Sequence, residues 1–259
     1  MCLIAVAWHA HRRYPLVLAA NRDEFHDRPS AALARWDDIP EVIGGRDLRG
    51  GGSWLAATRG RLAAVTNYRQ SQPLPAPRSR GLLVSDFLRS QVRAAAFACA
   101  IEVAADQYGP FNLLSYDGEE LVWTTSRPRP LWKGVAPGVH GVSNGAPSFV
   151  ASAQPWPKVR RLTDALERWL PQLDARGEPE PQPLFAALAD DRPAASRALP
   201  DTGVGAEAER RLSPPFIRGR GYGTRCSTVG WVERDGGVVL VERRFGAEGV
   251  FLGETRARV

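Results

Sequence analysis

The fold of this chain is decided by its opening stretch, MCLIAVAW at residues 1–8, together with LVLAANRDE at residues 16–24. Two apolar runs, at 3–8 and 14–20, are separated by HAHRR, which is the pattern of a β-hairpin. Neither run alternates between apolar and polar residues, and strands of this kind are usually covered on both faces. We therefore expect the hairpin to lie in the middle of a layered structure.

Strands and helices follow this hairpin in separate blocks. Further strands are predicted at 41–44, 53–57, 61–67, 111–116, 120–125 and 140–144, and two strands, 224–233 and 238–244, end the chain. Helices are predicted at 82–92, 94–106, 158–170 and 184–189, and the polar, Gly- and Pro-rich residues 190–215 are expected to form an excursion or a flexible loop. This order predicts a layered α+β sandwich in a single domain of residues 1–259.

The composition is that of a globular protein. Of its 259 residues, 44% are hydrophobic and 24% are charged, and no apolar run approaches the ~20 residues of a membrane helix. No basic residue precedes the opening apolar run and no small-residue cleavage site follows it, which argues against a secretory signal. We therefore expect a cytoplasmic protein.

A net charge of +6 invites a nucleic-acid hypothesis, but the distribution of the basic residues does not favour it. The arginines are scattered along the chain, and Lys133 and Lys158 are the only lysines. The triple glycine at 50–52 lacks the spacing of a phosphate-binding loop, so we expect a tight turn there. A basic pocket for an anionic small molecule is preferred over nucleic acid, and the richness in arginine and alanine indicates a bacterial genome.

The three cysteines, Cys2, Cys99 and Cys226, carry the first chemical hypothesis. They cannot form a disulfide framework, and no CxxC pair suggests zinc. Cys2 would become the N-terminal residue once Met1 is removed, and its α-amine, with a pKa ordinarily at about 7.7–8.0, could act as the base for its own thiol. The alternative is that Cys2 only begins a buried strand. Cys99 and Cys226 are expected to be packing residues.

A second cluster, Asn21-Arg22-Asp23-Glu24, directly follows the second apolar run. A solvated turn is one explanation. In a hairpin, however, the end of the second strand returns to the start of the first, which would bring this cluster beside Cys2. Asp23 could then hold the α-amine, and Arg22 could supply the positive potential that lowers the pKa of a thiol.

Several motifs of the chain together resemble the NRDE family, whose eukaryotic members are known as transport and Golgi organisation protein 2. They are MCLIAVAW, LVLAANRDEFHDRPS, IGGRDLRGGGSWLA, RLAAVTNYR, SRGLLVSDFL, FNLLSYDG, GVHGVSN and GYGTRCSTV. The resemblance runs over nearly the whole chain. It implies a four-layer αββα sandwich of the N-terminal-nucleophile hydrolase type, which agrees with the layers expected from the pattern.

A weaker resemblance is to the bile-salt and penicillin V amidases of that fold, which have an initial Cys, an Arg-Asn-x-Asp segment and two later Asn residues. Cys2, Asn21 and Asp23 match this pattern. It implies that Asn67 contacts the substrate and that Asn144 stabilises the oxyanion. The arginine that precedes the first Asn in those enzymes is replaced here.

Ala20 stands at that position, which leaves Arg22 or Arg225 to take over the role of the arginine. Arg225, in GTRCST, could face the nucleophile from the last strand pair, or it could pair with a surface carboxylate. Cys226 would point away from it, because neighbouring residues of a strand face opposite sides.

Two functional hypotheses follow from these residues and resemblances. In the first, Cys2 attacks an amide or related acyl bond of a small hydrophobic substrate, with Asp23 and Asn144 assisting, and no metal takes part. Substrate would be bound by Asn21, Arg22, Asn67 and Arg225. In the second, the same cleft carries a hydrophobic anion, haem or an acyl-CoA or lipid, without cleaving it. Both hypotheses expect Cys2, Asp23, Asn67, Asn144 and Arg225 to converge on one cleft.

Overall fold

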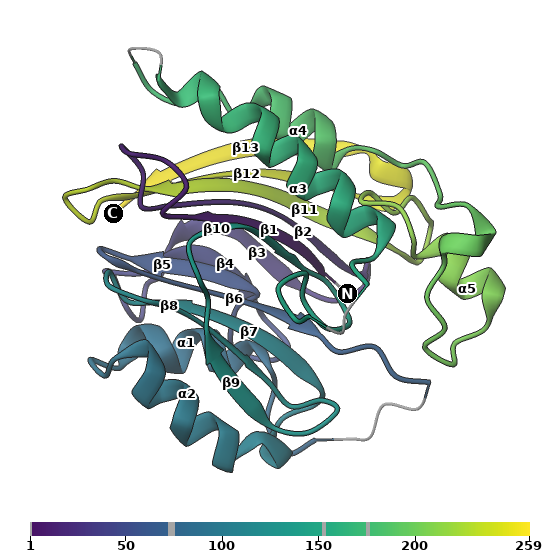
Figure 1. Ribbon diagram of the computed structural model, residues 1–259, viewed down its shortest axis with the longest axis horizontal. Coiled ribbons are helices and arrows are strands. Elements are labelled where there is room, and N and C mark those ends of the chain that lie inside the picture. The colour runs from purple at the N-terminus through teal and green to yellow at the C-terminus, as the bar shows by residue number, and fades with distance from the viewer. Residues whose placement is uncertain (1, 72–75, 152–153, 175–176) are drawn as a thin grey trace.

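Two antiparallel β-sheets packed face to face form the centre of the protein, and helices cover both outer faces (Figure 1). The structure is a computed structural model that describes residues 2–71, 76–151, 154–174 and 177–259. Each layer is held to the next by its own apolar cluster, one between the sheets and one under each pair of helices. The predicted four-layer αββα sandwich is confirmed.

The first sheet has six strands in the order β10-β1-β2-β11-β12-β13. They are β1 (Cys2–Trp8), β2 (Leu16–Phe25), β10 (Gly138–Val142), β11 (Tyr222–Val232), β12 (Val238–Phe245) and β13 (Phe251–Arg258). In β1, Ile4 packs into the core between the sheets while Leu3 packs under the helices. The two opening strands are therefore apolar on both sides because both of their faces are buried, as expected.

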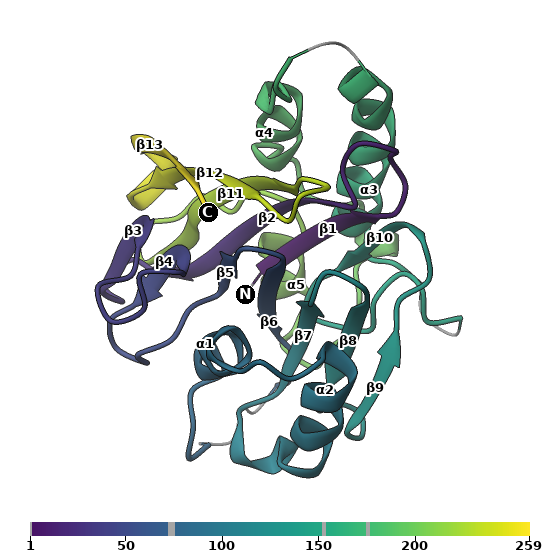
Figure 2. The same cartoon turned by 90° about the vertical axis from the view of Figure 1, so that its left-hand side faces the viewer.

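The second sheet has seven strands in chain order. They are β3 (Ser30–Arg35), β4 (Ile43–Asp47), β5 (Leu55–Thr58), β6 (Arg61–Asn67), β7 (Phe111–Tyr116), β8 (Leu121–Thr125) and β9 (Leu131–Gly134). Helices α1 (Gly81–Arg89) and α2 (Ala94–Val103) cover its outer face (Figure 2). The helix expected at 82–92 is found as α1, and Leu83, Phe87 and Leu88 make its buried face.

The outer face of the six-stranded sheet is covered by α3 (Pro157–Trp169) and α4 (Gln182–Leu188). The chain then continues into α5 (Ala206–Arg211), and short 3₁₀ turns lie at Ala105–Gln107, Leu170–Asp174, Ser196–Ala198 and Ala247–Gly249. Within residues 190–215, expected to be an excursion, Glu209 of α5 is buried in an ion pair with Arg69. No helix in the described part of the chain is long and apolar enough to cross a membrane.

Three expectations are corrected by the structure. The second strand does not end at residue 20 but runs to Phe25, because β1 and β11 pair with it on both sides. The chain ends in three strands rather than two, the third being β13. Cys99 is exposed rather than packed, because the buried face of α2 is made by Ala94, Phe97, Ala98 and Ile101.

Candidate functional site

Cys2 is the first residue of β1 and lies opposite Arg22 of β2. It is on the same side of β1 as Ile4, facing the second sheet, and it is 8% exposed. Beside it is a cavity of about 80 Å³, large enough for several water molecules. We call this cavity the Cys2 pocket.

The Cys2 pocket is strongly polar. Its lining includes three arginines, Arg22, Arg28 and Arg80, three carboxylates, Asp23, Glu24 and Asp47, and the polar residues Ser53, Asn67 and Ser79. A smaller space of about 10 Å³ between the sheets is lined by Cys2 and apolar residues such as Ile4 and Val65. The pocket therefore has a charged mouth and only a very small apolar base.

Opposing effects act on the pKa of the Cys2 thiol in the chain that carries Met1. Burial raises the pKa of the Cys2 thiol, and the nearby charge of Arg22 counteracts this only in part. Arg22 acts on the Cys2 thiol in the expected direction, because its charge lowers the pKa, but the cost of desolvating a thiolate is larger in this form.

Asp23 lies in the wall of the pocket and is almost completely buried. Its Oδ1 accepts a hydrogen bond of 2.6 Å from Oγ1 of Thr224 on β11. Burial raises the pKa of Asp23, whereas the positive charge of Lys158 opposes this rise. The carboxyl group is thus held at a fixed place beside the start of β1, as a group that orients an α-amine must be.

Lys158 of α3 is a residue that the sequence reasoning missed. Its Nζ donates to the carbonyl of Leu212 at 3.2 Å, and burial lowers its pKa to about 8. The sequence did indicate that Lys158 is buried, because it lies on the same helix face as Leu162 and Leu166. It supplies a buried positive charge behind Asp23.

Arg80 is a second missed residue, although it stands inside the motif SRGLLVSDFL. It lies at the N-cap of α1 and lines the Cys2 pocket, and no ion pair of its side chain occurs among the described residues. Its position depends on a very close contact between the β4–β5 loop and α1, where a Cβ on Gly52 would lie 2.1 Å from the carbonyl carbon of Gly81. Arg80 therefore places a guanidinium at the pocket, whereas Ala20, which stands where the amidases have an arginine, has none.

Asn67 lines the Cys2 pocket, whereas Asn144 is fully buried behind it. Nδ2 of Asn144 donates to the carbonyl of Asn67 at 2.9 Å. The adjacent Ser143 donates its hydroxyl hydrogen to the carbonyl of Cys2 at 2.8 Å. The two asparagines are thus joined to each other and to the start of β1, and their substrate and oxyanion roles stay predictions.

Arg225 and Asn21 do not point into the Cys2 pocket. Arg225 is the extra residue of a β-bulge in β11, and its Nη1 donates to the carbonyls of Phe25 and Arg28. The bulge places Arg225 and Cys226 in the wall of the same neighbouring pocket, so the expected alternation between them is wrong. The amide of Asn21 donates to the carbonyls of Leu188 and Pro215 on the helical side of the sheet.

The predicted convergence is therefore partial. Cys2, Asp23 and Asn67 share one pocket with Arg22, Asn144 supports it from behind, and Arg225 belongs elsewhere. Within the residues that the structure describes, no three His, Cys, Asp or Glu side chains are grouped to hold a metal ion.

The chain thus combines a four-layer αββα sandwich with a cysteine at the start of an inner strand, which is the architecture that the NRDE resemblance implied. The family model of Transport and Golgi organisation 2 matches residues 1–247, and the chain belongs to this family. The NRDE resemblance read from the motifs is thereby confirmed.

Two mammalian relatives are similar to this chain over most of their length. The Transport and Golgi organization protein 2 homolog of Homo sapiens is 32% identical over 246 residues, covering 89% of this chain and 86% of the relative. The Bos taurus homolog is 34% identical over 251 residues, with the same shares of 89% and 86%. These relatives come from animals, so the bacterial source expected from the composition stays a prediction.

Among solved structures, the Caenorhabditis elegans N-acylethanolamine-hydrolyzing acid amidase ortholog is similar with a TM-score of 0.44 and 11% identity. The match covers 88% of this chain and 92% of that chain. A similarity at this level does not indicate the function of this chain.

Proposed function

We propose that this protein is an N-terminal-nucleophile amidohydrolase in which Cys2, after removal of Met1, attacks the amide carbonyl of a small polar substrate. The observation that carries the proposal is the position of Cys2, which begins an inner strand and opens into a pocket that also contains Asp23 and Asn67. Removal of Met1 would leave the α-amine and the thiol on one residue, so that the amine can accept the proton of the thiol.

The reaction would proceed through a thioester. Sγ of Cys2 forms a bond to the carbonyl carbon, the C–N bond breaks, and the amine leaves with the proton that the α-amine took from the thiol. Water then attacks the thioester and releases the acid and the free thiol. Asp23 would hold the α-ammonium during the first step, and Asn67 and Arg80 would contact the substrate.

The lining of the pocket favours a polar substrate over the hydrophobic one expected from the resemblance. Three arginines face three carboxylates in the pocket, and the apolar space below Cys2 has a volume of only about 10 Å³. Ligand pockets for drug-sized molecules measure about 300–1,000 Å³. Haem or a long acyl chain would therefore require this pocket to open considerably.

The test is turnover of a panel of small N-acyl amides by protein whose intact mass shows that Met1 has been removed. We expect Cys2→Ala to lower turnover by about 10³-fold or more, and we expect the wild type to accumulate a covalent acyl adduct on the peptide that contains Cys2. Cys226→Ala is the matched control, because Cys226 is also a buried cysteine next to Arg22, on the opposite side of β2.

Retained turnover in Cys2→Ala would exclude Cys2 as the nucleophile. Full retention of Met1 in natively expressed protein would exclude the α-amine as the base. Absence of turnover, together with equal binding of haem or a long-chain acyl-CoA by the wild type and Cys2→Ala, would support the carrier hypothesis instead.

A further inference from the structure

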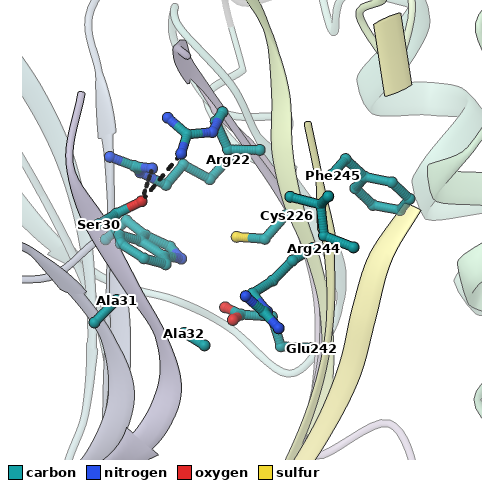
Figure 3. Close-up of a pocket in the computed structure, with 11 residues that line it drawn as sticks. Arg22, Ser30, Ala31, Ala32, Cys226, Glu242, Arg244 and Phe245 are labelled. Carbon is teal, nitrogen blue, oxygen red and sulfur yellow. Dashed lines mark hydrogen bonds between the residues drawn. The ribbon is translucent and has the colours of Figure 1, made fainter. Parts of the chain in front are cut away.

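A second pocket lies on the other side of Arg22 from Cys2. Its cavity of about 60 Å³ lies between β3 and the strands β2, β11 and β12 and is open on one side. Figure 3 shows Arg22, Cys226, Glu242 and Arg244 facing Ser30, Ala31 and Ala32 across this space. We call it the arginine pocket, because Arg22, Arg225 and Arg244 all line it.

These three arginines differ from many others in the chain. Arginines such as Arg28, Arg93 and Arg243 form ion pairs with carboxylates. Arg22, Arg225 and Arg244 have no ion pair within the described residues, although they converge on one cavity. The one carboxyl group in the lining is Glu242, so the pocket has an excess of two positive charges even when Glu242 is ionised.

Arg22 is the most buried of the three, with 5% of its surface exposed. Within the described chain its side chain makes one hydrogen bond, a long one of 3.5 Å from Nη1 to the hydroxyl of Ser30. Its guanidinium stacks 4.2 Å from the centre of the Trp54 ring. A guanidinium has five N–H donors, and a buried charge that is not paired is costly. Such a group is stabilised when an anion reaches it.

The other two arginines are arranged to meet the same anion. Arg225 donates through Nη2 to the same Ser30 hydroxyl at 3.4 Å, and burial together with the charge of Arg22 lowers its pKa. Nε of Arg244 is buried and has no hydrogen-bond partner among the residues that the structure describes. Like charges held this close, with donors unused, are typical of a site for a carboxylate or a phosphate.

The rim of the arginine pocket is apolar. Phe245 and Leu252 line it, and Val250, Phe251 and Leu252 are more than half exposed. Large exposed apolar side chains that adjoin one another mark a binding surface. The ligand should therefore have an apolar portion that lies against Phe245 and Leu252 while its charged group points inward.

We propose that the arginine pocket binds the carboxylate or phosphate group of a small amphiphilic molecule, with Arg22, Arg225 and Arg244 surrounding the anion. This site is separate from the Cys2 pocket and does not depend on amide hydrolysis. The two pockets share the side chain of Arg22, through which they adjoin.

The test is calorimetric titration and thermal unfolding of the full chain with octanoate, inorganic phosphate and octan-1-ol as probes. Octanoate should bind saturably, phosphate more weakly because it lacks the apolar portion, and octan-1-ol not at all because it lacks the charge. Arg244→Gln should weaken octanoate binding by about tenfold or more, because a charge-assisted hydrogen bond is lost.

Arg243→Gln is the matched control, because Arg243 precedes Arg244 in the same strand and pairs with Glu254 away from the pocket. It should leave octanoate binding unchanged. Without octanoate, Arg244→Gln should unfold at the same temperature as the wild type or higher, since one of three like charges is removed. A merely structural arginine would instead lower the unfolding temperature.

The proposal is overturned if no probe binds saturably, if octan-1-ol binds as well as octanoate, or if Arg243→Gln weakens binding as much as Arg244→Gln. Should Arg244→Gln fail to fold, Arg244→Lys replaces it. Lysine keeps the charge and loses the fork of donors, so binding weaker than wild type supports the site, and unchanged binding overturns the role of Arg244.

Discussion

The two pockets that meet at Arg22 differ in how their charges are balanced. In the Cys2 pocket, Arg22, Arg28 and Arg80 face Asp23, Glu24 and Asp47, whereas in the arginine pocket three arginines face only Glu242. A balanced set of charges can orient a polar amide without attracting a particular net charge. An unbalanced set attracts an anion. We therefore expect the two neighbouring cavities to take different ligands.

The two pockets also differ in how firmly their arginines are bonded to the rest of the protein. Arg28 is bonded to Asp47 at 2.6 Å, and Asp47 also accepts hydrogen bonds from the backbone N–H groups of Arg49 and Gly50. This network fixes one wall of the Cys2 pocket. Arg22 has no such network, and its removal should therefore have a different effect on stability.

The largest expected effect comes from removing a paired arginine. Arg69→Met should lower the free energy of unfolding by about 3–5 kcal/mol, because Glu209 would remain buried without its partner. Arg22→Met should change it by less than about 1 kcal/mol, since it leaves no carboxylate unpaired. Urea unfolding of both variants measures the difference. If Arg22→Met is as costly as Arg69→Met, Arg22 is a structural residue and the contrast between the pockets fails.

A second variant tests the wall of the Cys2 pocket. Gly52→Ala should cost about 3 kcal/mol and abolish amide turnover, because its Cβ would displace the start of α1 and with it Arg80. Gly51→Ala is the control, since Gly51 has a positive φ of 75° but open space around it, and should cost only about 1 kcal/mol. Thermal unfolding and turnover are measured on both. Wild-type turnover in Gly52→Ala would show that this contact does not shape the site.

Much of this architecture could be predicted from local pattern. The strand β1 and the helix expected at 158–170 were predicted correctly, because the spacing of apolar residues within each of them indicates which side chains are buried. β13 was missed because its residues alternate between half-exposed and exposed, so no apolar run marks it. The continuation of β2 through Asn21-Arg22-Asp23-Glu24 depends on β11, whose sequence lies about two hundred residues further along the chain.

The site was predictable to the extent that β1 and β2 form a hairpin. That pairing brings Arg22 opposite Cys2 and places Asp23 one residue further along. The prediction for Arg225 was wrong because a β-bulge, for which the sequence shows no pattern, turns its side chain into the arginine pocket. Arg80 was missed because it lies at the N-cap of α1, on the other sheet's side of the pocket. Only the packing of the two sheets brings it near Cys2.

The third prediction concerns the buried charge behind Asp23. The pKa of Lys158 is lowered to about 8 from 10.5, so between these pH values the unfolded chain holds a proton that the folded chain has lost. The free energy of unfolding should therefore rise by about 3 kcal/mol from pH 8 to pH 10.5. Below pH 8 the buried Lys158 is charged in the folded chain, and the full cost of burying that charge lowers the stability. Lys158→Met should lack this rise. Parallel slopes for both proteins would mean that Lys158 is not penalised by burial.

The smallest expected effect is a change in the labelling rate of Cys2 when an anion binds in the arginine pocket. Exposed Cys99 should react with iodoacetamide faster than buried Cys2 in the chain that carries Met1, because burial raises the pKa of Cys2. The charge of Arg22 lowers that pKa, so an anion in the arginine pocket that neutralises Arg22 should raise it. Saturating octanoate should then slow the labelling of Cys2 by about twofold to tenfold. Peptide mass spectrometry measures both cysteines in one sample, and Cys99 on the distant helix α2 is the internal control. Equal slowing of both thiols would point to a general effect of octanoate, and unchanged labelling of Cys2 would show that the pockets are electrostatically independent.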